Sequence, residues 1–431
     1  MDRLLKSALT IREIKFRMDD DYIDRLTRQY TVIILICFGF LVSTKQFVGR
    51  PITCWCPANF EESHRDYADA ICWVSNTYYL PLKTIIPAKT LSDAANHHNH
   101  RHNHHHNYPS EDSEQYPQMI SYYQWVPLIL IFQGLLSFIP CLFWRFLNRR
   151  SGVNMTAIMD AARVCSQASY LEIREKAIRY VVNQMDRYLL AQREYRTGCV
   201  VRIKHFIAKA CCLIGGKLYG NYLISCYMMI KILYVANAVG QLFLLDAFLK
   251  IDYHMYGVHI VEKLVRGQDW GYSEKFPRVT LCEFDIRYQS RLHSYVVQCA
   301  LTINLFNEKL FTFLWFWFVF LAFATAVNFL RWLFRSLYWP GHVQYVRKQI
   351  RVMDAAPREA GTLAKFAENY LRRDGMFIVR LIGMNMGEVV AGEVLCGLWN
   401  NYSPERRTLA EKPGRKNIVK NRANGGRLEV V

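Results

Sequence analysis

The sequence of 431 residues lacks the short motifs by which many enzymes bind phosphate, metal or an acyl substrate. It has no glycine-rich phosphate loop, no His-Glu-x-x-His pair and no nucleophile elbow. The Gly215-Gly216 pair stands without the rest of a phosphate loop. We therefore predict no catalytic residue, no metal, no cofactor and no enzymatic activity.

Charged residues are also scarce in four long apolar stretches. The clearest runs from Val126 to Trp144, and as a helix it would be roughly 28 Å long, enough to cross a hydrocarbon core. A nucleic-acid binder would interleave apolar and basic residues, whereas here the apolar residues are gathered into runs. We therefore predict membrane lipid as a partner, no nucleic acid, and spans at 30–48, 125–147, 222–249 and 310–330.

The third of these spans carries two ionisable residues, Lys231 and Asp246. Charged side chains within a span usually face a water-filled path or lie near an end and extend outward. A third reading makes this run a buried core helix. Lys231 is thus a candidate for lining a pore, and Asp246 is expected near the end of its span.

Acidic residues are scarce, with 36 against 54 Lys and Arg and a formal charge of +18. The excess lies between the second and third spans, for example at Arg149, Arg150 and Arg163, and in the tail. Basic segments stay in the cytoplasm, so both termini are predicted inside. Residues 1–29 contain no apolar core before a cleavage site, so the first span is expected to act as its own signal.

These observations predict an all-α membrane protein with four transmembrane helices, minor β structure in the extracellular loops and a helical cytoplasmic domain. The predicted segments are 1–29, N-terminal; 30–48, first span; 49–124, first outer loop; 125–147, second span; 148–221, cytoplasmic loop; 222–249, third span; 250–309, second outer loop; 310–330, fourth span; 331–402, helical tail; and 403–431, disordered end.

Few of the 13 cysteines belong to the predicted outer loops: Cys54, Cys56, Cys72, Cys282 and Cys299. Extracellular space is oxidising, so outer cysteines tend to pair, and five leaves one over. A metal site at Cys54-Trp-Cys56 is the competing reading. Its gap is one residue shorter than usual for zinc, and the compartment disfavours it.

Residues 97–107 of the first outer loop read HHNHRHNHHHN and hold seven of the 13 histidines. Imidazole binds transition metals and titrates near neutral pH, so metal or proton sensing is chemically possible. The simpler reading is a disordered insertion, because the tract has no apolar residue with which to pack.

Several segments together resemble the innexins, the invertebrate gap-junction channel proteins. The outer loops read PITCWCPANF, ICWVSNTYYLP and FPRVTLCEFDIR, and the tail contains RDG and LWNNY. The second span opens with a similar signature, YYQWVP, which is Tyr122, Tyr123, Gln124, Trp125, Val126 and Pro127. The resemblance covers roughly residues 15–402, without the histidine tract and much of the cytoplasmic loop.

The resemblance implies a plasma-membrane gap-junction subunit in a homo- or hetero-oligomeric ring of about eight innexins, docked to the ring of a neighbouring cell. Such a channel would pass ions and small metabolites. The resemblance also favours a pore role for the N-terminal segment, with Asp2, Arg3 and Lys6 as candidates, over a helix lying on the inner leaflet. An undocked hemichannel and a four-span adhesion protein without a pore remain as alternatives. Asn-x-Ser/Thr acceptors occur only at Asn154 and Asn401, both predicted inside.

The innexin pattern has two cysteines in each outer loop, which here match Cys54, Cys72, Cys282 and Cys299. Cys56 is then the extra cysteine. If the loops run antiparallel, the first cysteine of one meets the second of the other. This favours Cys54–Cys299 and Cys72–Cys282 over the parallel pairing Cys54–Cys282 and Cys72–Cys299.

Overall fold

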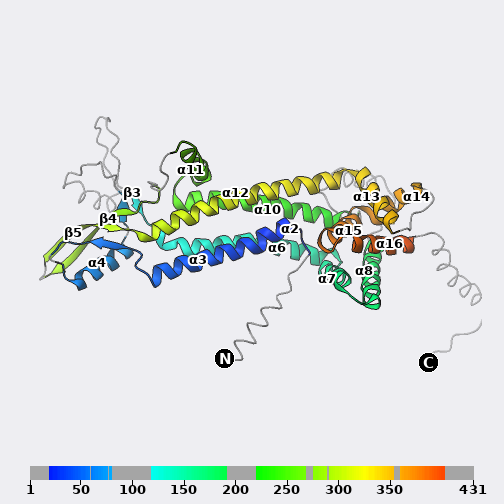
Figure 1. Ribbon diagram of the computed structural model, residues 1–431, viewed down its shortest axis with the longest axis horizontal. Coiled ribbons are helices and arrows are strands. Elements are labelled where there is room, and N and C mark those ends of the chain that lie inside the picture. The colour runs from blue at the N-terminus through cyan, green and yellow to red at the C-terminus, as the bar shows by residue number, and fades with distance from the viewer. Residues whose placement is uncertain are drawn as a thin grey trace, which may run out of the picture. The chain divides into compact units, whose positions relative to one another are not determined.

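A computed structural model of the chain describes residues 19–58, 60–75, 77–79, 118–191, 220–267, 275–288, 291–353 and 360–402 (Figure 1). The predictions for Asp2, Arg3 and Lys6, for the histidine tract and for the chain end lie outside these residues. The chain divides into two compact units. The helical unit comprises Met1–Val32, Leu135–Val239 and Phe320–Val431, and the sheet unit comprises Ile33–Gly134 and Gly240–Val319.

Four helices of the described residues are long and apolar enough to cross a membrane: Tyr22–Phe47, Tyr122–Ser151, Tyr222–Leu249 and Thr302–Leu337. The first is built from α2 (Tyr22–Arg25), the π-helical turn η1 (Leu26–Tyr30) and α3 (Thr31–Phe47). The others are the 3-10 turn η2 (Tyr122–Trp125) with α6 (Val126–Ser151), then α10 (Tyr222–Leu249) and α12 (Thr302–Leu337).

These helices expose large apolar side chains, including Phe40 at 71%, Leu135 at 63% and Phe323 at 70%. Such surfaces suit lipid or neighbouring subunits. The first and fourth of these helices extend further than the apolar runs, because α2 already begins at Tyr22 and α12 has 36 residues. Charge interrupts a hydropathy pattern without ending a helix, so apolar runs mark the membrane core better than they mark helix ends.

The sheet unit contains one antiparallel sheet in the order β1-β5-β4-β2-β3. Its strands are β1 (Thr53–Trp55), β2 (Thr77–Tyr79), β3 (Gln118–Ile120), β4 (Val279–Tyr288) and β5 (Arg291–Ala300), and its short helices are α4 (Glu62–Val74), η4 (Tyr253–Met255) and α11 (Tyr256–Val265). β4 and β5 pair over ten residues as a long hairpin (Figure 1). In β5, Val297 and Cys299 are buried, whereas residues 291–294 are exposed, so the end of the hairpin near Arg291 is open to solvent in the single subunit.

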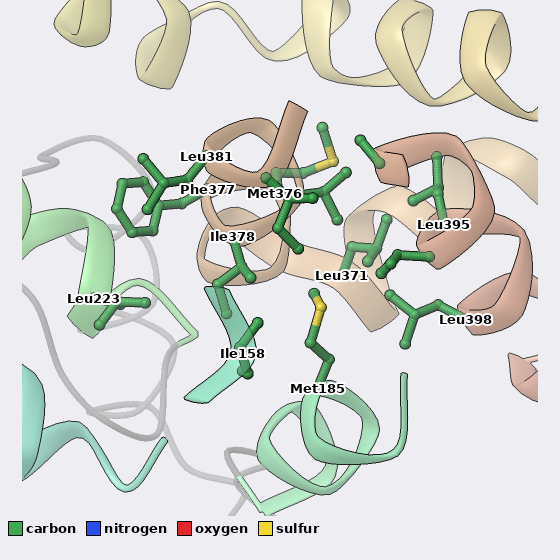
Figure 2. Close-up of a cluster of buried hydrophobic side chains, with 14 of the residues drawn as sticks. Ile158, Met185, Leu223, Leu371, Met376, Phe377, Ile378, Leu381, Leu395 and Leu398 are labelled. Atoms are coloured by element: carbon green, nitrogen blue, oxygen red, sulfur yellow. The ribbon is translucent and has the colours of Figure 1, made fainter. Parts of the chain in front are cut away.

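The helical unit adds amphipathic helices around one apolar core. They are α7 (Met155–Gln167), α8 (Leu171–Ala191), α13 (Trp339–Val352), α14 (Ala360–Lys365), the π-helical η5 (Phe366–Leu371), α15 (Arg372–Met386) and α16 (Glu388–Tyr402). Figure 2 shows Met185 of α8 pointing toward side chains of α15 and α16, among them Ile378 and Leu398. Apolar residues at three- and four-residue spacing place these side chains on one face of each helix. The predicted fold class, with four spans, helical segments and minor β structure, is confirmed.

Candidate functional site

The YYQWVP segment fixes the entrance of the second long helix. Tyr123 is fully buried, its ring centroid lies 5.0 Å from that of Trp73, and its carbonyl accepts a hydrogen bond of 2.8 Å from the Gln46 side chain. Gln124 donates to the backbone carbonyl of Trp73 on α4. The segment therefore ties the start of α6 to the end of α3 and to the outer-loop helix.

The aromatic residues of this segment have different environments. Trp125 is 58% exposed, as a ring in the headgroup belt would be. Tyr122 instead packs edge-on against Phe248 and Phe276 inside the sheet unit. Trp125 therefore fits an interfacial position, whereas Tyr122 and Tyr123 are packing residues.

One disulfide joins the first cysteine of the first outer loop to the second cysteine of the other. Cys54 of β1 and Cys299 of β5 are directly opposite each other in the ladder, with Cα atoms 3.9 Å apart. The Asp69 carboxylate accepts a hydrogen bond of 2.7 Å from the backbone N–H of Cys54. The bond thus locks the short edge strand β1 onto the hairpin.

The second disulfide joins Cys72 of α4 to Cys282 of β4, and both side chains are fully buried. The two bonds have the antiparallel pairing. Cys56 is a free, half-buried thiol whose pKa is raised by burial. The sulfur atoms of Cys54, Cys72 and Cys299 lie within 4.8 Å of one another. All three are oxidised in disulfides and offer no thiolate to a metal.

The structure corrects the expectation that Lys231 lines a pore. Its side chain is 1% exposed, and its Nζ lies 2.7 Å and 2.8 Å from the two carboxylate oxygens of Asp24, which is also 1% exposed. Tyr227 donates to the same carboxylate at 2.8 Å. A lysine buried and paired inside one subunit does not face water, so it is a structural ion pair.

Asp19, Asp20 and Asp21, which interrupt the apolar pattern in the sequence, are buried partners of the same region. The indole N–H of Trp332 donates to the Asp21 carboxylate at 2.9 Å, and that of Trp144 donates to the Asp19 carbonyl at 3.2 Å. Burial raises the pKa of the Asp20 carboxyl to about 7, although the Arg28 guanidinium 2.8 Å away opposes this shift. Two features of the sequence could have predicted this buried polar cluster: three adjacent acids just before the first span and a lysine within another span.

The Arg-Asp-Gly segment of the tail contacts the start of the third long helix. Asp374 is fully buried, and one carboxylate oxygen accepts from the backbone N–H of Ile224 at 3.0 Å while the other accepts from the Tyr188 hydroxyl at 3.1 Å. The first N–H groups of a helix have no partner within it, so a carboxylate there acts as a cap. Asp374 therefore joins the tail, α8 and α10.

The fold and these contacts define a class: a four-span membrane protein whose two outer loops are cross-linked into one sheet. The innexin family model matches residues 20–402. The chain is 36% identical to innexin unc-9 of Caenorhabditis elegans over 397 residues, covering 92% of this chain and 95% of that protein. It is 31% identical to innexin-19 of Caenorhabditis briggsae, covering 98% and 95% of the two chains.

The chain therefore belongs to the innexin family. It is a multi-pass plasma-membrane protein and a gap-junction channel subunit in the general sense that the family defines. Innexins are channel proteins, so the family points to a non-enzyme, as the missing catalytic motifs predict.

Proposed function

We propose that this subunit assembles with itself or other innexins into a ring of about eight, which docks to a matching ring on an adjacent cell. The docked pair passes ions and small metabolites. The observation that carries the proposal is the cross-linked sheet, in which both outer loops contribute strands held by Cys54–Cys299 and Cys72–Cys282. Two rings meet in register only if each subunit presents a rigid outer face.

The hairpin of β4 and β5 provides such a face. The last part of the hairpin exposes polar groups, and within it the Ser294 hydroxyl donates to the Asp285 carboxylate at 2.5 Å. The side chains of Arg291 and Leu292 are exposed as well. A polar, rigid hairpin suits a contact that forms between two water-covered surfaces.

The topology belongs to the same proposal, with both termini cytoplasmic and segments 49–124 and 250–309 outside. The support is the basic excess between the second and third spans and in the tail. An epitope near Asp112 should stain on intact cells and one near Glu429 should stain only after permeabilisation. The reverse pattern would contradict this topology. The N-terminal residues Asp2, Arg3 and Lys6 are proposed to lie at the cytoplasmic mouth of the pore.

Dye transfer between paired expressing cells tests the proposal. A docked channel passes a small charged dye from an injected cell to its partner. Dye release into the medium without transfer would instead support an undocked hemichannel, and neither transfer nor release with normal surface expression would favour an adhesion role.

A further inference from the structure

A cavity of about 550 Å³ lies inside the helical unit, where α6 ends and α7 begins. Arg145, Asn148 and Arg149 line it from the last turns of α6, and Thr156 and Asp160 line it from α7. α7 follows α6 after a short turn (Figure 1). Neither docking nor the passage of ions through the channel accounts for this cavity.

One part of the cavity wall attracts anions. Arg145 and Arg149 are four residues apart and therefore lie on one face of α6. Within the described part of the chain neither guanidinium forms an ion pair, and the Arg145 Nε is buried without a hydrogen-bond partner. The 13-residue helix α7 presents its first turn, including Thr156, to the same space. Two arginines and the positive end of a helix suit a phosphate.

Another part of the cavity wall has a buried hydrogen-bond acceptor, the side-chain oxygen of Asn148. Asn148 is 6% exposed, and among the described residues its Oδ1 has no hydrogen-bond partner. A buried amide oxygen without a donor costs free energy, so a ligand donor there is favourable. The carboxylates of Asp19 and Asp160 also line the cavity and attract a cation. The ligand should therefore carry a phosphate and a cationic group that retains N–H bonds.

The position of the cavity distinguishes a lipid from a soluble phosphoester. Arg145 directly follows the uncharged run that ends at Trp144, so it lies where the apolar core of a bilayer gives way to the phosphates. In the topology proposed above, this is the inner leaflet. A lipid headgroup is held at that depth by its own acyl chains, whereas a soluble ligand is not.

We propose that this cavity binds the headgroup of an inner-leaflet phospholipid with a primary amine, of the phosphatidylethanolamine type. The phosphate binds Arg145, Arg149 and the first turn of α7, and the ammonium donates to Asn148 Oδ1 and Asp160. A choline headgroup offers the same phosphate, but its quaternary nitrogen has no N–H to donate. The site therefore discriminates ethanolamine from choline headgroups through Asn148.

Native mass spectrometry of the purified full-length protein in detergent tests this, with ethanolamine and choline phospholipids of identical acyl chains supplied at equal concentration. The wild type should retain the ethanolamine lipid about tenfold over the choline lipid, since one charge-assisted hydrogen bond separates them. Asn148→Leu should bind both lipids about equally, because it removes only the acceptor.

Arg149→Gln should lower retention of both lipids by about tenfold, because it removes a phosphate contact. Arg149 is exposed, so this change leaves the core intact, and the elution volume of the oligomer checks that. The matched control is Arg150→Gln, one residue along the same helix. Arg150 stacks on Phe146 at 4.3 Å and does not line the cavity, so its loss should leave retention unchanged.

Equal lipid retention by the wild type and Arg149→Gln would overturn the proposal, as would equal binding of both lipids by the wild type. Soluble glycerophosphoethanolamine provides the last arm. If it displaces the lipid at equal concentration, the site takes a soluble phosphoester and the lipid assignment is wrong. If it fails to compete, the lipid assignment stands.

Discussion

Lys231 and Asp24 form an ion pair that is closed to solvent, although 207 residues separate them in the chain. The pair joins α10 to α2, next to the π-helical turn η1. Insertions of this kind within helices are often found at functional sites. Neither charge has water as an alternative partner. Lys231 Nζ also lies 3.5 Å from the Asp21 carboxylate, whereas Lys231 is the cation that neutralises Asp24.

Removing one member of this pair should therefore destabilise the protein strongly. Lys231→Met leaves the Asp24 carboxylate buried and unpaired, which typically costs about 3–5 kcal/mol. The expected result is a lower thermal midpoint of the purified protein and less of it at the cell surface. The double variant Lys231→Met/Asp24→Asn should recover part of the loss, because the introduced amide is neutral and still accepts from Tyr227. Lys263→Met, at an exposed lysine, is the control and should behave as wild type. A double variant no more stable than the single one would contradict this account.

Asp374 should be needed to attach the tail to the third long helix. Asp374→Ala removes the cap of α10, leaves the Ile224 N–H without its acceptor and deletes the hydrogen bond from the Tyr188 hydroxyl. Each unsatisfied buried donor costs about 1–3 kcal/mol. Thermal unfolding of the purified variant should show a clear loss, with Asp374→Asn in between because one amide oxygen still accepts. Glu175→Ala, at an exposed acid of α8, should be neutral. Equal midpoints for Asp374→Ala and Glu175→Ala would argue against a capping role.

Local patterns predict the spans well because an apolar run carries its own signal. The bounds of α10 coincide with the predicted third span, 222–249. The pairing of the outer cysteines follows from the antiparallel course of the two loops. The antiparallel ladder between β1 and β5 has this course. For the outer loops only minor β structure was predicted. The ten-residue hairpin was missed, because the strand pattern of β4 and β5 lies in a segment with mixed charge.

Local sequence patterns could not predict the long-range polar contacts. The position of Lys231 was left between a pore and a helix end, because its partner Asp24 lies in the N-terminal segment 1–29, for which no contact with the third span was predicted. The same holds for Asp374, whose role depends on where the tail folds back onto Ile224. Apolar faces are periodic and can be recognised locally, whereas one carboxylate meeting one backbone N–H leaves no periodic trace.

The disulfide assignment can be checked chemically. Non-reducing peptide mapping should link Cys54 to Cys299 and Cys72 to Cys282, and fragmentation between Cys54 and Cys56 identifies the bonded sulfur. Each bond typically stabilises by about 2–4 kcal/mol, so Cys54→Ser should lower the amount of folded protein. Cys56→Ser is the matched control and should leave both bonds in place. A bond that uses Cys56 instead of Cys54 would refute the assignment.

His342 should make the protein sensitive to acid. It is 3% exposed, its Nε2–H donates to the Arg335 carbonyl at 2.6 Å, and burial lowers its pKa to about 4, helped by Arg380 and Arg373. The unfolded chain takes up this proton near pH 6.5, so stability falls as the pH drops from 6.5 toward 4, by about 3 kcal/mol at 1.36 kcal/mol per pH unit.

The raised pKa of Asp20 acts in the opposite direction, since it favours the folded state as pH falls below 7. Comparing His342→Gln with wild type at each pH cancels that contribution. The drop in thermal midpoint from pH 7.5 to pH 5 should be smaller in His342→Gln than in wild type, because glutamine can still donate to Arg335 and does not titrate. His293→Gln, at an exposed histidine of β5, should follow wild type. An unchanged acid response in His342→Gln would contradict the assignment.

The central claim is that this innexin forms a channel between cells, and junctional conductance between two voltage-clamped cells tests it most directly. Pairs in which both cells express the wild type should show junctional conductance, as should pairs expressing Cys56→Ser. Pairs expressing Cys54→Ser should show none. Absence of junctional conductance in wild-type pairs, with the protein present at the apposed membranes, would contradict the claim.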